Sequence, residues 1–228
     1  MIATDRLIFL HLHKSGGTFV NALLAHCIPT ARRIGYHLPY REVPEEHRGL
    51  PVVGTVRNPW HYYVSWFHFQ RHQRNPNILF QICSDRGSLG FSQTVANLVA
   101  IASDKPRLAE LEENIPDDFV NFGLNLTKRC VGELRERQLG FYSFLYERLY
   151  AGSADPTIMR MEMLRENLRQ MLVDAGHMPN DCAERFLREA PPLNTSCHNS
   201  PAEYYDPGLA SLIAERDGVV IDRYGYSL

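Results

Sequence analysis

The sequence predicts an α/β fold: a single domain whose central parallel sheet is flanked by helices, with a glycine-bearing, P-loop-like turn after the first strand. Two observations support this. A short apolar run followed by a turn and a helical segment occurs twice in the first third of the chain, and parallel strands need such helical crossovers. The length of 228 residues also suits one domain.

The first strand–turn–helix unit begins with the apolar run at residues 7–10, which has no helical stripe and is typical of a buried strand. Residues 11–18 form a turn that contains two glycines. Apolar residues then recur at helical spacing, which predicts a helix that ends near Pro29.

The second unit repeats this order. Residues 51–56 indicate a buried strand, Arg57 and Asn58 form the turn, and Pro59 begins a helix that reaches about His72. Asn58 is the expected N-cap of this helix, because its side chain can accept a hydrogen bond from the first turn.

The rest of the chain carries weaker signals. A polar stretch is expected at 104–118, a loop at 191–194 and a helix stop at Gly176. We expect segment 74–140 to be a helical insertion that binds the substrate. The remaining elements are expected as a strand at 157–161 and helices at 93–102, 124–137, 162–175 and 207–216.

Composition excludes several classes of protein. Hydrophobic residues make up 44% and charged residues 22% of the chain, which is ordinary globular usage and not that of a disordered, collagen-like or coiled-coil protein. The formal net charge of −2 gives no electrostatic case for binding nucleic acid or an anionic membrane. Any anion must therefore be held by a local site.

The five cysteines are odd in number and scattered, with no paired spacing. This pattern suggests neither a disulfide framework nor a metal site. The sequence shows no export signal and no apolar run long enough to span a membrane. We therefore expect a soluble, reduced, cytoplasmic protein, and the oligomeric state stays open.

The turn at 11–18 has the features of an anion site. A strand that leads through glycines into a helix places backbone N–H groups and the positive end of the helix at one point. Lys14 adds an ammonium group, and Thr18 adds a hydroxyl. The turn is not a Walker A motif, because its lysine precedes the glycines. The alternative is an ordinary turn in which glycines are needed for steric reasons alone.

The turn after the second strand suggests another anion site. Arg57 can bind an anion with two parallel hydrogen bonds, and the hydroxyl of Ser65 follows eight residues later. Two such sites in one sheet imply a ligand with two separated phosphates. The alternative places Arg57 in a salt bridge and packs Ser65 within its helix.

These segments resemble the sulfotransferase superfamily, in its carbohydrate-sulfotransferase branch. Residues 11–18 are similar to the family's H-x-P-K-T-G-G-T loop, and residues 56–67 to its V-R-[DN]-P-x-x-R-x-x-S-x-[YF] signature. Tyr62 stands where the family commonly has an arginine, and His13 where it has a proline. Weaker similarities occur, in the family's order, at 160–164, 193–196, 204–207 and 224–226.

The resemblance implies the donor adenosine 3′-phosphate 5′-phosphosulfate (PAPS), an acceptor that is a small molecule or carbohydrate, and no metal. Arg57 and Ser65 would hold the 3′-phosphate, and Lys14 would act beside the bridging oxygen. The negative charge that builds on the leaving phosphate would be stabilised by the loop's N–H groups and by Lys14. The residues expected around the 5′-phosphosulfate are Lys14, Ser15, Gly16, Gly17, Thr18 and Phe19.

The acceptor hydroxyl needs a base, and histidine is suited to this role near neutral pH. We expect His37 to be that base, because it lies between the first helix and the second strand, where family members with a histidine base place it. His11 is expected to orient Lys14 or to pack beside it. The alternatives to His37 are the nearby carboxylates of Glu42, Glu45 and Glu46.

Two other functions are weighed against sulfotransfer. A P-loop nucleotide or small-molecule kinase would need magnesium and a lysine after the glycines, and the sequence lacks that pattern. A non-catalytic binding module would not need Lys14 or a base. Neither the acceptor nor the sulfated position can be inferred from the sequence.

Overall fold

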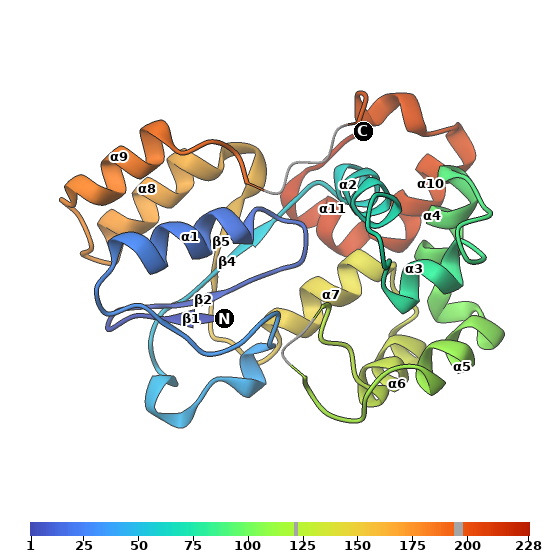
Figure 1. Ribbon diagram of the computed structural model, residues 1–228, viewed down its shortest axis with the longest axis horizontal. Helices are drawn as coiled ribbons and strands as arrows, with labels where there is room; N and C mark the ends of the chain where they lie inside the picture. Colours follow the sequence, from blue (N-terminus) through green and yellow to red (C-terminus); the bar gives the residue numbers. More distant parts are fainter. Residues whose placement is uncertain (121–122, 194–197) are drawn as a thin grey trace. The chain divides into compact units, whose positions relative to one another are not determined.

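The computed structural model describes residues 1–120, 123–193 and 198–228 (Figure 1). The chain forms two compact units, Met1–Arg57 with Arg148–Thr195 and Asn58–Glu147 with Ser196–Leu228, and each is described by itself. Of the segment 193–196 that resembles the family's C-terminal motif, residues 194–196 lie outside the described residues.

The first unit contains a five-stranded sheet with the order β3-β1-β2-β4-β5. The parallel sheet is confirmed for three strands, since β2 pairs with β4, and β4 with β5, in parallel. The prediction of parallel pairing is wrong for β1 and β3, because β1 pairs antiparallel with both β2 and β3. The four residues between β1 and β2 are too few for a crossover helix. The strands are β1 (Ile2–Ala3), β2 (Ile8–Leu10), β3 (Arg32–Arg33), β4 (Val52–Val56) and β5 (Thr157–Arg160).

Three helices cover one side of this sheet: α1 (Gly17–Cys27), α8 (Leu164–Asp174) and α9 (Asp181–Glu189) (Figure 1). They bury an apolar face against the strands, and burial of this kind is the main stabilising contribution to such a layer. The core includes Phe9, Val53 and Met159 from the sheet and Phe19, Val20, Leu23, Leu24, Leu168, Leu172, Ala183 and Leu187 from the helices.

The expected helix at 162–175 forms as a 3-10 turn (Met161–Met163) followed by α8. Gly176 ends it with φ +69°, as predicted. Helix α9 was not predicted. Five of its nine residues are charged, yet its apolar residues Cys182, Ala183, Phe186 and Leu187 recur at helical spacing on one face, so the sequence does carry a signal for this helix.

In the second unit, the start of α2 confirms the predicted cap. Asn58 Oδ1 accepts a hydrogen bond of 3.0 Å from the backbone N–H of Trp60, and Pro59 is the first helical residue. The helices that contribute to this unit are α2 (Pro59–Arg71), α3 (Ile78–Cys83), α4 (Phe91–Val99), α5 (Lys105–Glu113), α6 (Lys128–Arg137), α7 (Phe141–Tyr150), α10 (Pro207–Arg216) and α11 (Gly218–Tyr224).

The expected insertion at 74–140 is helical, and its elements differ from the prediction. Helix α3 was not predicted, and the helix expected at 93–102 forms as α4 followed by a 3-10 turn. Segment 104–118, expected as a polar connection, contains α5, which Asp104 caps by accepting a hydrogen bond from Arg107 N at 3.1 Å. The helix expected at 124–137 begins only at Lys128. The 3-10 turns outside α8 lie at Tyr40–Glu42, Glu45–His47, Ile101–Ser103 and Pro201–Tyr204.

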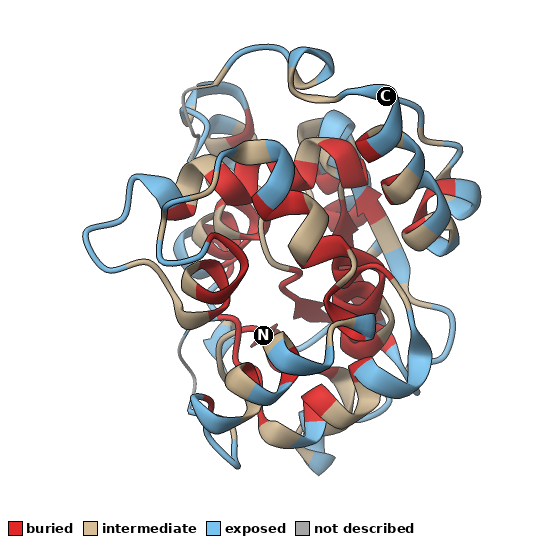
Figure 2. Ribbon diagram, turned by 90° about the vertical axis from the view of Figure 1, so that its right-hand side faces the viewer, coloured by how far each residue is buried: buried red, intermediate tan, exposed pale blue. Residues whose placement is uncertain are grey.

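Most aromatic side chains of α2 are buried in the core of the second unit. Buried and exposed stretches alternate along the helices in Figure 2. Tyr62 is fully buried and stacks on Tyr142 with ring centroids 4.2 Å apart. Trp60, Tyr63, Trp66 and Phe67 are buried as well.

A carboxylate is buried in the same unit. Asp217 Oδ2 accepts a hydrogen bond of 2.6 Å from the Tyr63 hydroxyl, and its Oδ1 accepts one of 2.7 Å from Ser143 N. A Cβ at Gly140 would lie 2.5 Å from Asp217 Oδ1, so this position has no room for a side chain. Burial raises the pKa of Asp217 to about 6.

Across the described ranges, no helix has both the length and the apolar character needed to cross a membrane.

Candidate active site

The turn after β2 depends on two glycines. Gly16 has φ +81°, and a Cβ there would lie 2.8 Å from Leu164 Cδ2. A Cβ at Gly17 would lie 1.9 Å from His11 Cδ2, so no side chain fits between α1 and that ring. Both glycines therefore have a steric role within the unit, and phosphate binding by the turn stays a prediction.

The start of α1 is suited to an anion. Its N-cap is Gly16, which has no side chain to cap the first N–H groups, and its first turn contains no acidic residue. Uncapped N–H groups at a helix start attract negative charge. Ser15 is buried and its hydroxyl donates to the carbonyl oxygen of His13 at 3.2 Å. The side chain of Phe19 lies in the core and its backbone N–H donates to the carbonyl oxygen of Gly16 at 3.0 Å, so its part in binding a ligand stays a prediction.

The two predicted anion turns meet within the first unit. Strands β2 and β4 are parallel neighbours, so their carboxyl ends lie at the same edge of the sheet. There Arg57 Nη1 donates a hydrogen bond of 3.1 Å to the carbonyl oxygen of Lys14. The next strand adds Arg160, which is paired with Val56 in the register of β4 and β5.

Lys14 has an altered proton affinity. Burial, together with the positive charge of Arg57, lowers the pKa of its ammonium group to about 8. The side chain is still charged at neutral pH. The like charge nearby means that an anion bound here would be attracted by both groups.

His37 is buried and held in one orientation. Its Nδ1 donates a hydrogen bond of 2.7 Å to the carbonyl oxygen of His11, so the lone pair of the neutral ring is on Nε2. In the part of the chain that the structure describes, Nε2 has no hydrogen-bond partner. Burial lowers the pKa of His37 to about 4, so the ring is an uncharged base at neutral pH.

His37 and Lys14 both have left-handed backbone conformations, with φ of 48° and 54°. Such angles cost a non-glycine residue free energy and occur often at functional sites. The observation is not specific, because five other non-glycine residues in the described ranges share it.

His11 and His13 surround His37. The ring centroid of His37 lies 4.3 Å from that of His11 and 5.4 Å from that of His13. His11 is buried and its Nδ1 accepts a hydrogen bond of 3.0 Å from Asn21 Nδ2. Burial holds the pKa of both rings well below the usual value. The alternative in which His11 packs is the one that these contacts favour.

The alternative bases lie in a different environment. Glu42, Glu45 and Glu46 are all exposed. Glu42 lies 3.7 Å from Arg41, and Glu45 forms a 3.0 Å ion pair with Arg48. Two of the three carboxylates are thus engaged by arginines at the surface, whereas His37 is buried and held in one orientation by its hydrogen bond to His11 O. This contrast favours His37.

Ser65, the expected partner of Arg57 at the 3′-phosphate, is buried on α2 in the second unit. Arg57 belongs to the first unit, so this pairing stays a prediction. Tyr62, at the position where the family commonly has an arginine, serves the aromatic core of the second unit.

Sequence reasoning missed two buried residues of the first unit, Tyr150 and Arg148. Tyr150 accepts a hydrogen bond from Thr55 N and donates one to Thr55 O, both at 2.9 Å. A Cβ at Gly54 would lie 2.2 Å from the Tyr150 hydroxyl. Arg148 is buried, and its charge contributes to lowering the pKa of His37. Both residues are on α7, for which no helix was predicted.

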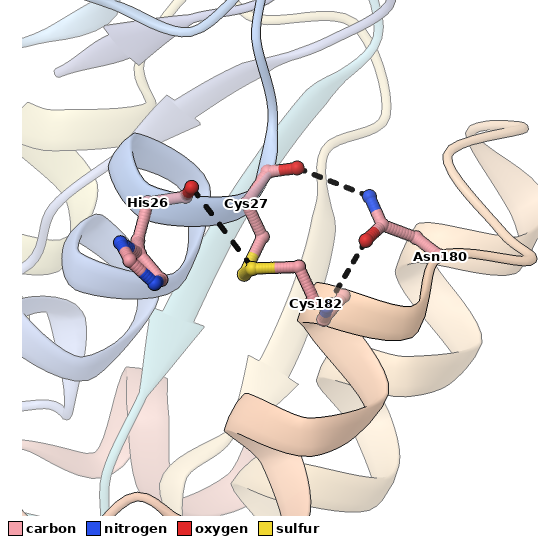
Figure 3. Close-up of a disulfide and its surroundings, with 5 residues drawn as sticks. His26, Cys27, Asn180 and Cys182 are labelled. Carbon is pink, nitrogen blue, oxygen red and sulfur yellow. Dashed lines mark hydrogen bonds between the residues drawn. A yellow bond between two sulfur atoms is a disulfide. The ribbon is translucent and has the colours of Figure 1, made fainter.

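The expectation of a reduced chain without disulfides is wrong for Cys27 and Cys182. Their sulfurs form a disulfide between the end of α1 and the start of α9 (Figure 3). The two cysteines are 155 residues apart in sequence, and the fold brings their Cα atoms to 5.4 Å. Sequence spacing alone cannot reveal such a pair. With His26 they form a group whose ligand atoms lie within 4.8 Å of one another, but the disulfide already occupies both sulfurs.

No protein-family model matches the chain, and neither the curated proteins nor the solved structures contain a match. The functional conclusion therefore depends on the residues of the chain and their geometry.

Proposed function

We propose that this protein is a PAPS-dependent sulfotransferase, which moves a sulfuryl group from PAPS to a hydroxyl or amine of an acceptor and releases adenosine 3′,5′-bisphosphate. The observation that carries the proposal is the hydrogen bond from Arg57 to the carbonyl of Lys14. It joins the two turns that the sequence singles out, at the carboxyl edge of parallel strands where α/β proteins bind their ligands.

Different residues of the chain act on different parts of the donor. When bound, PAPS supplies the activated sulfuryl group. The N–H groups at the start of α1 and the ammonium group of Lys14 stabilise the charge that develops on the leaving phosphate. Arg57 holds the 3′-phosphate; Ser65, which the resemblance assigns to the same phosphate, is in the second unit, and its contribution stays a prediction.

On the acceptor side, His37 Nε2 takes the proton of the attacking hydroxyl. The hydrogen bond from Nδ1 to His11 O fixes the tautomer and the ring orientation, as a general base requires. The acceptor is proposed to be a carbohydrate or glycoconjugate, and acceptor binding by segment 74–140 of the second unit stays a prediction. A cytoplasmic location stays a prediction, and the Cys27–Cys182 disulfide counts against it, because disulfides persist mainly in oxidising compartments.

Calorimetric titration with adenosine 3′,5′-bisphosphate, without magnesium, tests the proposal. We expect the wild type to bind, and Arg57→Ala to bind roughly 10- to 100-fold more weakly, since a hydrogen bond to a charged group contributes about 1.5–3 kcal/mol. Arg32→Ala is the matched control, because Arg32 is an exposed arginine on β3 of the same unit. AMP, which lacks the 3′-phosphate, should bind more weakly than the bisphosphate.

The same titration separates the alternatives. Preference for ATP with magnesium would favour the kinase and contradict the proposal. Tight binding of the bisphosphate without any release of it from PAPS, over a panel of carbohydrate acceptors, would favour a binding module. Equal affinity of the wild type and Arg57→Ala would remove the observation on which the proposal depends.

A further inference from the structure

The two sulfurs of the Cys27–Cys182 disulfide differ in their access to solvent. Cys27 is buried at the end of α1, with 6% of its surface exposed. Cys182 is partly exposed and lies in the wall of an open pocket of about 220 Å³, together with His26, Arg185, Phe186, Glu189 and Ala190. Cys182 Sγ lies 4.0 Å from the carbonyl oxygen of His26 (Figure 3). A molecule that enters the pocket therefore meets the sulfur of Cys182 first.

One face of α9 forms most of this pocket. Arg185, Phe186 and Glu189 follow Cys182 by three, four and seven residues, so the four side chains share a face of the helix. Glu189 is paired with Arg188 at 2.9 Å. Arg185 has no ion pair or hydrogen bond within the described ranges. Its planar guanidinium is suited to a carboxylate, which it can bind with two parallel hydrogen bonds.

We propose that Cys182 is a modification site, at which a small thiol that carries carboxylate groups exchanges with the disulfide. The thiolate sulfur of the small molecule attacks Cys182 Sγ and forms a new S–S bond. The bond between Cys182 and Cys27 breaks, its electron pair stays on Cys27 Sγ, and Cys27 then takes a proton from water. Arg185 binds a carboxylate of the incoming thiol and places its sulfur near Cys182. The exchange needs no other oxidant or reductant.

The reduced protein favours the same adduct. Cys182 is the more exposed of the two thiols and the second residue of α9, where the N–H groups of the first turn favour a thiolate and the carboxylates of Asp181 and Glu184 oppose it. Cys27 is the last residue of α1, where the carbonyl end of the helix disfavours negative charge. In the reduced protein, Cys182 is therefore the thiol that attacks the disulfide form of the same small molecule. Exchange that starts from the protein disulfide is the slower direction, because it leaves charge on Cys27.

Glutathione is the probe for the test, since it carries two carboxylates. Folded wild-type protein is treated with glutathione, and the reduced protein with glutathione disulfide. Each reaction is stopped with acid and analysed by intact mass and peptide mapping. We expect one glutathione per chain, attached to Cys182, from both directions. An adduct on Cys27, or no adduct at Cys182 from either side, would overturn the proposal and leave the disulfide as a structural link only.

The role of Arg185 is tested by rates. Arg185→Gln should slow the reaction with glutathione roughly tenfold, which is the loss expected for one hydrogen bond to a charged group. It should leave the rate with 2-mercaptoethanol, an uncharged thiol, unchanged. Arg48→Gln is the matched control, because Arg48 is an exposed arginine of the same unit that does not line this pocket. Equal slowing with both thiols, or no slowing with either, contradicts a carboxylate site.

A measurement on the wild type alone tests the role of Arg185 without depending on whether a variant folds. The ratio of the glutathione rate to the 2-mercaptoethanol rate should fall as salt is added, because salt screens an exposed charge pair. A ratio that does not depend on salt would count against Arg185. None of these outcomes depends on sulfotransfer, so this proposal and the proposed function can fail independently.

Discussion

Each unit of the molecule buries a titratable group, and the two groups are used in different ways. In the second unit, both oxygens of Asp217 accept hydrogen bonds, from Tyr63 and from Ser143. In the first unit, His37 uses only Nδ1, toward the carbonyl of His11. Burial shifts both pKa values toward the uncharged form, to about 6 for Asp217 and about 4 for His37.

The comparison shows why a shifted pKa does not by itself identify a catalytic group. Both carboxylate oxygens of Asp217 already accept hydrogen bonds, one from Tyr63 of α2 and one from Ser143 of α7. Asp217 therefore links two helices that are far apart in sequence. His37 keeps a lone pair for another molecule and lies beside the histidines of a turn that also bears a cation. The lone pair that His37 keeps on Nε2 is the difference that favours a chemical role for the first unit.

The largest effect is expected at Lys14. Lys14→Ala should lower turnover roughly 100- to 1,000-fold, because it removes a preorganised charge from the leaving phosphate, while the far-ultraviolet circular dichroism stays unchanged. Release of adenosine 3′,5′-bisphosphate from PAPS, over a panel of carbohydrate acceptors, measures it. Lys105→Ala, an exposed lysine of α5, is the matched control. Normal turnover in Lys14→Ala would contradict the role of this residue.

The next effect is expected at His37. His37→Asn should lower turnover roughly 100-fold, the usual lower range for losing a general base. Asparagine tolerates the left-handed backbone of this position. In the wild type, kcat/KM should fall below pH about 4, where His37 gains a proton, and above pH about 8, where Lys14 loses one. His47→Asn is the control in the same connection. Full activity of His37→Asn would contradict this assignment and would favour Glu42, Glu45 or Glu46 as the general base.

The strands and helices that form the predicted edge could be read from the sequence, because each has a local signature. The apolar runs at β2 and β4, the Asn58 cap and the glycine stop at Gly176 all depend on neighbours in the chain. The sequence predicts Lys14 and Arg57 in two separate anion turns of one sheet, because each residue follows a strand. In the structure Arg57 donates a hydrogen bond to the carbonyl oxygen of Lys14 within the first unit, and anion binding by either turn stays a prediction.

The missed features depend on contacts between distant segments. The disulfide joins residues that are 155 positions apart in sequence. Tyr150 forms hydrogen bonds with Thr55, which is 95 positions away. Strands β1 and β3 have two residues each, which is too short for any periodic pattern. Arg148 is buried near His37 although arginine is rarely a core residue. A local pattern carries no information about such partners.

The smallest effect is expected at Asp217, and it concerns how folding stability depends on pH. The contribution of Asp217 to this dependence has the opposite sign from that of His37. The folded-state pKa of Asp217, about 6, lies above the ordinary value of 3.8, so the folded state binds the proton first as the pH falls. Stability from this group therefore rises as the pH falls from about 6 to 4, by up to about 3 kcal/mol at 1.36 kcal/mol per pKa unit. For His37, whose pKa is lowered from 6.5 to about 4, the unfolded state binds the proton first, and stability falls over a similar range.

Urea unfolding of the wild type, Asp217→Asn and His37→Asn between pH 4 and 7 separates the two contributions. Asp217→Asn should be less stable than the wild type by about 1–3 kcal/mol at pH 7, because its amide cannot accept from both Tyr63 and Ser143, and the deficit should grow as the pH falls. His37→Asn should lose less stability on acidification than the wild type. If Asp217→Asn instead approached the wild type at low pH, Asp217 would be stabilised as the ionised form, and the contrast between the two units would have to be abandoned.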